Sequence, residues 1–470
     1  MKAQRYLKIA MAGATAILIS LSIASRTEAA VGDLDLRFGN GGKVVTEFST
    51  DFDEARAVAI QSNGKIVAAG NAFNSSTGNY DFALARYDKN GNLDNSFGNN
   101  GKVTTHLSGN TPAPFPTVET AKAIAIQNNG RIVVAGTGFN GSTGATDFAV
   151  LRYLSNGRLD RRFGQHGIVL TDFGGINARA NSMVLQPDGK IVVAGTLERT
   201  FTQPDFVLVR YNTDGSLDST FGDNGKVFTD VSRGIEEANA VRLTPDGKIL
   251  VGGEAFIECP GLSCGASNFV LLRYNANGGI DSSFGNGGVV TTDFDIRDGI
   301  TALDIAPNGK IIAGGFADRL CSGPGCPRFA LARYNVNGSL DTTFGDGGKV
   351  TTQLGDTSQI TAIAITAGLP TAKIVVAGYF QERRVCGAAT GDIFPCDFAL
   401  LRYNWDGTLD TSFGTGGKVF TDIGNGTQDQ AFDLAIDERG QIILAGNGGG
   451  NFALTRCLGI SKCERAEKRY

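Results

Sequence analysis

The chain has 470 residues, a formal net charge of −4 and a hydrophobic fraction of 41%, which is enough for a continuous core. This charge excludes the basic surface that nucleic acids or anionic membranes attract. Glycine contributes 65 residues and proline only 12, without a Gly-X-Y period, so collagen and disorder are excluded and frequent tight turns are indicated.

The first predicted element is a secretory signal over residues 1–29. Lys2, Arg5 and Lys8 precede an apolar run from Ile9 to Ala24, and small residues stand at 27 and 29, where a signal peptidase cleaves. The run is shorter than the roughly 20 residues of a membrane span. We therefore expect an exported protein, in the periplasm, at the cell surface or secreted, with no membrane insertion after cleavage. An uncleaved anchor is the alternative.

Two short elements then recur along the chain, and each occurs seven times. The first, LDxxFG, starts at Leu34, Leu93, Leu159, Leu217, Ile280, Leu340 and Leu409. The second, close to GKIVxAG, starts at Gly64, Gly130, Gly189, Gly247, Gly309, Ala372 and Gly440, and an FALxRY stretch follows it each time. Repetition at this spacing indicates a solenoid, a propeller or an array.

One repeat contains four predicted strands, at residues 57–61, 65–69, 82–87 and 103–105. Ser62-Asn63-Gly64 is a typical hairpin turn, and alanines alternate in the first strand, as a crowded innermost strand requires. Residues 71–80 and 137–146 are predicted loops between the second and third strands. Four antiparallel strands in each of seven units predict an all-β fold, a seven-bladed β-propeller.

The two ends of the repeat region complement each other. Residues 43–46 form a lone fourth strand, whereas the last repeat stops after its third strand at residues 452–456. We predict that the N-terminal outer strand completes the last blade and removes the open sheet edges. The propeller then spans residues 30–457, and residues 458–470 form a C-terminal tail.

The combination of NGxLDxxFGxxGKVxT, GKIVxAG and DFALxRY, from Leu34 to Arg456, closely resembles the delta-60 repeat family of exported bacterial proteins. The resemblance implies a β-propeller fold and an exported location. It brings no established catalytic residues.

A charged pair recurs with the repeat. Arg86 ends the third strand and Asp94 follows eight residues later, so the two can pair across the hairpin, where the planar guanidinium matches a carboxylate. The same pattern predicts that Arg456 pairs with Asp35 when the ring closes. A symmetric anion site lined by these arginines is the alternative.

Eight cysteines lie in the second half of the chain. An even number in an exported protein indicates disulfides, and proximity suggests four local pairs, although the sequence does not prove the connectivity: Cys259 with Cys264, Cys321 with Cys326, Cys386 with Cys396, and Cys457 with Cys463. A zinc site is less consistent with pairs that lie a repeat apart without a neighbouring histidine.

Other candidate chemistry has simpler interpretations. Asp88, Asn90, Asn92 and Asp94 loosely resemble a calcium loop, but an Asx-rich turn explains them. His106 and His166 lie in different repeats and are interpreted as solvent-facing or packing residues. Acids between repeats are interpreted as solvated loop residues: Asp51, Asp53, Glu54, Glu236, Glu237, Asp293, Asp295, Asp298 and Asp429. We expect no metal and no cofactor.

The variable loops of such blades emerge on one face, where rigid scaffolds commonly carry binding sites. The longest loop carries Arg383, Arg384 and Phe394, our candidate ligand-binding residues. We predict a non-enzymatic, monomeric scaffold that presents loops to a protein, glycan or cell-envelope partner. The alternatives are a metal-dependent hydrolase on the acidic loop face and a structural surface or matrix component.

Overall fold

The computed structural model describes residues 30–107, 119–199, 204–232, 234–256, 266–318, 327–366, 371–381, 396–424 and 428–459. Within these ranges the chain forms 28 β-strands and no helix. Accordingly, this part of the chain contains no helical segment of the length and apolar character needed to cross a membrane.

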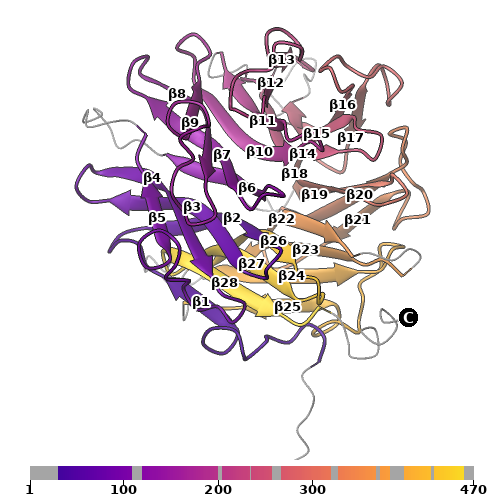
Figure 1. Cartoon of the computed structure of the whole chain (residues 1–470). Coiled ribbons are helices and arrows are strands. Elements are labelled where there is room, and N and C mark those ends of the chain that lie inside the picture. Colours follow the sequence, from indigo (N-terminus) through magenta and orange to yellow (C-terminus); the bar gives the residue numbers. More distant parts are fainter. Residues whose placement is uncertain are drawn as a thin grey trace, which may run out of the picture.

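The strands form seven four-stranded antiparallel blades around one axis (Figure 1). Blades 1 to 3 are β2 (Asp53–Ile60), β3 (Ile66–Asn74), β4 (Asn79–Tyr87) and β5 (Lys102–Thr105); β6 (Thr120–Ile126), β7 (Ile132–Asn140), β8 (Ala145–Tyr153) and β9 (Ile168–Thr171); and β10 (Ala178–Leu185), β11 (Ile191–Glu198), β12 (Pro204–Tyr211) and β13 (Lys226–Thr229).

Blades 4 to 6 are β14 (Glu236–Leu243), β15 (Ile249–Phe256), β16 (Ser267–Tyr274) and β17 (Val289–Thr292); β18 (Arg297–Ile305), β19 (Ile311–Asp318), β20 (Arg328–Tyr334) and β21 (Lys349–Thr352); and β22 (Thr357–Ile365), β23 (Ile374–Gln381), β24 (Cys396–Tyr403) and β25 (Lys418–Thr421). A single parallel pair, Ser267 with Arg297, links the sheets of blades 4 and 5. Blade 7 comprises β26 (Gln430–Ile436), β27 (Ile442–Gly448), β28 (Asn451–Cys457) and β1 (Lys43–Thr46).

Ring closure by the N-terminal strand is confirmed. β1 pairs antiparallel with β28, in a register that places Lys43 opposite Thr455 and Thr46 opposite Phe452. The innermost strands of blades 1 and 7, β2 and β26, also contact each other. The outer edge of blade 7 is therefore paired by a strand from the far end of the sequence.

Every innermost strand contains a β-bulge, which explains a glycine of the GKIVxAG element. In blade 1 the register shifts between Ala55 and Ala57, so the backbone of Glu54 bends toward the second strand. A Cβ on Gly70 would lie 1.9 Å from the Glu54 carbonyl oxygen. The equivalent glycines of the other blades meet the same obstruction: Gly136, Gly195, Gly253, Gly315, Gly378 and Gly446.

The strands are longer than the sequence patterns indicate. Residues 71–80 are not a loop: β3 runs to Asn74, β4 starts at Asn79, and Gly78 N donates to Asn74 O at 2.8 Å to close a tight turn. Residues 137–146 form the same hairpin in blade 2. The two predicted variable loops are short because the strands continue into them. Their Asn and Gly residues still pair in the sheet ladder, where neighbouring blades cover both faces of the sheet.

The recurring arginine and aspartate lie side by side in all seven blades. Arg86 Nε donates to Asp94 Oδ2 at 2.8 Å, and Arg456 Nη2 donates to Asp35 Oδ2 at 3.0 Å across the ring closure. The guanidinium also makes a contact that the sequence did not indicate, because Arg86 Nη1 donates to the Ser155 carbonyl of the next blade. Each arginine thus links two neighbouring blades. The alternative of a symmetric anion site is not supported, because these guanidinium groups already bind acceptors within the protein.

Candidate functional site: a polar cavity on the propeller axis

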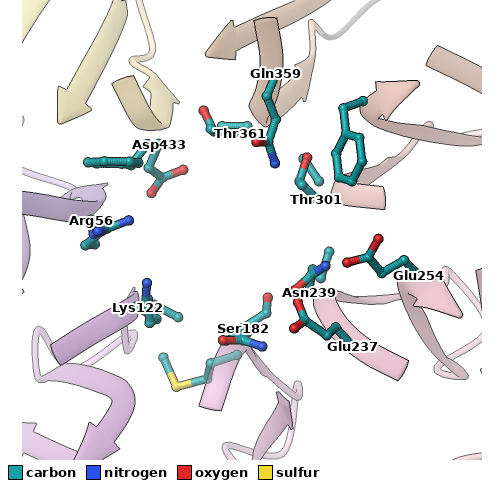
Figure 2. Close-up of a pocket in the computed structure, with 18 of the residues that line it drawn as sticks. Arg56, Lys122, Ser182, Glu237, Asn239, Glu254, Thr301, Gln359, Thr361 and Asp433 are labelled. Atoms are coloured by element: carbon teal, nitrogen blue, oxygen red, sulfur yellow. The ribbon is translucent and has the colours of Figure 1, made fainter. Parts of the chain in front are cut away.

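A cavity of about 620 Å³ lies on the propeller axis, lined by residues from all seven blades. It lies at the end of the axis where β19 ends and β18 and β20 begin, since Asp318, Arg297 and Pro327 contribute to its wall. Figure 2 shows side chains from the surrounding blades converging on it.

The cavity is lined by the bulged residue of each innermost strand. A bulge adds a residue without a ladder partner, and here that residue turns its side chain toward the axis. In blade order these residues are Arg56, Lys122, Asn181, Asn239, Thr301, Thr361 and Phe432.

Four bulged residues, in blades 3 to 6, are fixed by the next blade. Asn181 Nδ2 donates to Ala238 O and Asn239 Nδ2 donates to Ile300 O, both at 3.0 Å. Thr301 Oγ1 donates to Ile360 O, and Thr361 Oγ1 donates to Ala431 O at 2.8 Å. This half of the ring is therefore a rigid wall of amides and hydroxyls.

The other three bulged residues, in blades 7, 1 and 2, form a cationic side. The Arg56 guanidinium lies 3.9 Å from the Phe432 ring centroid, and its Nε lies 2.5 Å from Glu54 Oε1. Lys122 has no hydrogen bond or ion pair with any residue that the structure describes. Burial, with a contribution from Arg56, lowers the pKa of Lys122 to about 8. The Glu54 carboxylate acts in the opposite direction on this pKa, but among the described residues no acid forms an ion pair with the amine.

Acids lie on the opposite side, where Figure 2 shows Glu237 and Glu254 facing Arg56 and Lys122 across the cavity. Burial, followed by repulsion from Glu237, raises the pKa of Glu254 to about 7, and Ser267 Oγ donates to its Oε2 at 3.1 Å. Asp433, on the cationic side, accepts the Val58 and Leu434 amides at 2.8 Å each, and burial raises its pKa to about 6.

This arrangement can hold a polar molecule by hydrogen bonds and by charge at either end. Its lining combines fixed amides and hydroxyls with the apolar side chains of Met183, Phe316 and Phe432. No histidine or cysteine is among the described residues that line it, and the Ser182 hydroxyl already accepts the Val241 amide at 3.2 Å.

The residues singled out from the sequence lie elsewhere. Arg86 and Asp94, like Arg456 and Asp35, pair within a blade where its third strand leads to its fourth, and the arginines also reach the next blade. None of these residues lines the axial cavity. Arg383, Arg384 and Phe394 lie outside the described residues, as do Cys259, Cys264, Cys321, Cys326, Cys386 and Cys463. Cys396 and Cys457 are buried, and no disulfide joins them. The disulfide pairs thus stay predictions.

The Asx turn is confirmed, because Asp88 Oδ1 accepts the amides of Asn90 and Asn92.

The interpretation of the inter-repeat acids as solvated was wrong for five of them, because Glu54 is buried beside Arg56 and four others are buried completely. Asp53, Glu236, Asp298 and Asp429 are fully buried. Asp53 Oδ2 accepts the Phe48 and Ser49 amides at 2.7 and 2.9 Å, and the other three accept loop amides in the same way. The cause is the tight turn between repeats, whose amides have no ladder partner and need an acceptor.

The sequence analysis missed the ring of bulged residues. A β-bulge has no characteristic turn residue or sequence motif. In the sequence, the bulged position therefore cannot be distinguished from its neighbours in a regular strand, and nothing indicates that its side chain faces the axis. The available signal was variation: this one position holds Arg, Lys, Asn, Thr or Phe, and in every blade at least one of its two neighbours in sequence is alanine.

Six segments of the chain match the sequence profile of a β-propeller described as a domain of unknown function, DUF5122: residues 61–97, 127–163, 186–221, 244–284, 306–344 and 396–413. Repeats of this domain therefore run across the chain. No curated protein matches the sequence.

Solved structures of similar fold are distant in sequence. A virginiamycin B lyase from Staphylococcus aureus, with quinupristin, has 9% identity and a TM-score of 0.43, over 88% of this chain and 98% of the lyase. Sqt1 from Chaetomium thermophilum has 12% identity and a TM-score of 0.44, over 89% and 98%. An ulvan lyase has 11% identity and a TM-score of 0.44, over 90% and 99%. These likenesses concern the fold alone.

Proposed function

We propose that the protein is an exported, non-enzymatic β-propeller that binds an acidic saccharide of the cell envelope or its surroundings at the mouth of the axial cavity. The observation that carries the proposal is Lys122, a cavity-lining amine without a paired counter-charge among the described residues, beside Arg56. An anionic group of the ligand would supply that counter-charge, and the amides and hydroxyls of blades 3 to 6 would meet its hydroxyl groups.

The exported location rests on the N-terminal sequence pattern and on the resemblance to the delta-60 repeat family. Arg383, Arg384 and Phe394 lie in the sequence between β23 and β24. The chain leaves β23 and enters β24 at the end of the blade where β22 begins, and Gln359, near that end, lines the cavity. We propose that this loop extends the binding surface. The hydrolase alternative relied on the inter-repeat acids, and four of those carboxylates are engaged by loop amides.

Binding to acidic saccharides is expected to depend on the cationic side of the cavity. The mature protein would be screened against a panel of acidic and neutral oligosaccharides, and the best ligand measured by calorimetry. Lys122→Met and Arg56→Ala should each weaken binding at least about tenfold, equivalent to about 1.4 kcal/mol. Added salt should weaken it as well.

The matched control is Lys89→Ala, which removes an exposed cation far from the axis. Affinity should be unchanged in this variant. A ligand whose affinity is indifferent to both Lys122→Met and Arg56→Ala, or a preference for neutral saccharides, would contradict the proposed site.

A further inference from the structure

Three potential metal ligands meet where blade 1 joins blade 2. Asp81 lies on β4, His106 directly follows β5, and Glu119 directly precedes β6. His106 Nδ1 lies 2.8 Å from Asp81 Oδ1 and 3.9 Å from Glu119 Oε2, and one ligand atom from each residue lies within 4.8 Å of the others. The two carboxylates are buried, whereas the imidazole is 20% exposed. The interpretation of His106 as an isolated residue was therefore wrong.

Both carboxylates are held in place by further hydrogen bonds. Asn74 Nδ2 donates to Asp81 Oδ2 at 2.8 Å, which leaves Oδ1 toward His106. The Leu107 amide donates to Glu119 Oε2 at 2.9 Å. Metal sites use such outer contacts to orient their ligands.

The same three positions recur at every blade junction. At the junction of blades 6 and 7 they hold Asp397, Asp422 and Asp429, whose ligand atoms also lie within 4.8 Å of one another. The convergence therefore follows from the fold and not from one local loop. The junction of blades 5 and 6 holds Arg328, Gln353 and Ser358 instead, and Arg328 pairs with Asp295 at 3.3 Å.

An unpartnered buried oxygen at the next junction indicates the chemistry that these positions require. Asp147 is the equivalent of Asp81, and its Oδ2 accepts Asn140 Nδ2 at the same 2.8 Å. Its Oδ1, the atom equivalent to the one that meets His106, is buried and has no hydrogen-bond partner. Asp172 occupies the histidine position there. A carboxylate oxygen directed into the junction thus needs a hydrogen-bond donor, a proton or a cation beside it.

We propose that Asp81, His106 and Glu119 bind a divalent transition-metal ion, with Zn²⁺ as the best match. One imidazole nitrogen and two carboxylate oxygens are ligands that zinc accepts. Two ligand atoms about 2.1 Å from a tetrahedral metal lie about 3.4 Å apart, and the two distances from His106 Nδ1 bracket that separation. The bound ion would tie the outer strand of blade 1 to the innermost strand of blade 2.

The histidine content allows a direct test, because the chain has only two histidines. His166 is the control: it lies in a turn with a φ of 57°, at a position where Asn100 and Asn224 adopt the same conformation, so His166→Asn should be tolerated. In that variant every imidazole NMR signal belongs to His106. After chelator treatment, one equivalent of Zn²⁺ is expected to shift these signals and to abolish the pH titration of the ring.

Glu119→Gln and Asp81→Asn, made in the same background, should weaken zinc binding at His106 at least about tenfold. The unsubstituted protein should show one shifted and one unshifted ring. The proposal is overturned if about 1 mM Zn²⁺ leaves the His106 signals unchanged, or if the two variants bind as tightly as their parent. Zinc uptake seen by calorimetry without a change at the His106 ring counts against it as well, since cysteines or other acids would then be the ligands.

Discussion

Replacing Asp35 by alanine is expected to destabilise the protein as much as Asp218→Ala does. Both carboxylates are nearly fully buried and pair with a buried arginine, Arg456 at 3.0 Å and Arg210 at 2.7 Å. Removing one member of such a pair leaves the other charge buried and costs about 3 to 5 kcal/mol. The melting temperature, measured by calorimetry, should fall by several degrees in both variants.

The two variants should differ in which segment of the chain is loosened. Asp218 lies between strands that are continuous in sequence, whereas Asp35 lies in the segment that leads into β1, which pairs only with the far end of the chain. Asp35→Ala should therefore also speed amide exchange and proteolysis over residues 30–46, and Asp218→Ala should not. Arg37→Ala is the control, because it removes an exposed partner of Asp35, and exposed pairs contribute only about 0 to 1 kcal/mol. A wild-type melting temperature for Asp35→Ala would show that the ring closure does not depend on this pair.

The fold could be predicted from the sequence because each repeat contains local signals that indicate the order of its strands. Six units contain a glycine turn at Gly64 or its equivalent, and six contain a second turn at Gly91 or its equivalent, so most strands are linked to the next by local signals. The complementary fragments at the two ends then specify closure. These are short-range patterns in Gly, Asn and apolar residues, repeated seven times.

The cavity could not be predicted in the same way. Which side chain of an innermost strand faces the axis depends on a bulge, and the bulge follows from the packing of that strand against its neighbours. No sequence pattern therefore singled out Arg56 or Lys122. The metal-ligand group has the same origin, since Asp81, His106 and Glu119 come from three strands of two blades and only the ring brings them together.

The second large effect is expected from Glu254→Gln, and its size should depend on pH. Burial raises the pKa of Glu254 to about 7, above the ordinary value near 4.5. A carboxyl with a raised pKa contributes stability that is fully present below pH 4.5 and is lost as the pH rises through 7. A difference of about 2.5 in pKa corresponds to about 3 kcal/mol. Because glutamine resembles the protonated acid, the variant should equal the wild type near pH 4.5 and melt at a higher temperature near pH 8.

Asp94→Asn provides the opposite case. Lys65, Ser96 and Arg86 hold the pKa of Asp94 far below its usual value although partial burial alone would raise it. Its contribution is present above about pH 4 and lost only in stronger acid, so Asp94→Asn should lower the melting temperature at pH 8 and at pH 5 alike. Melting curves of wild type and both variants between pH 4.5 and 8 test the assignment. Equal shifts for Glu254→Gln at both ends of this range would mean that the carboxyl is ionised throughout, with Arg297 and solvent stabilising its charge.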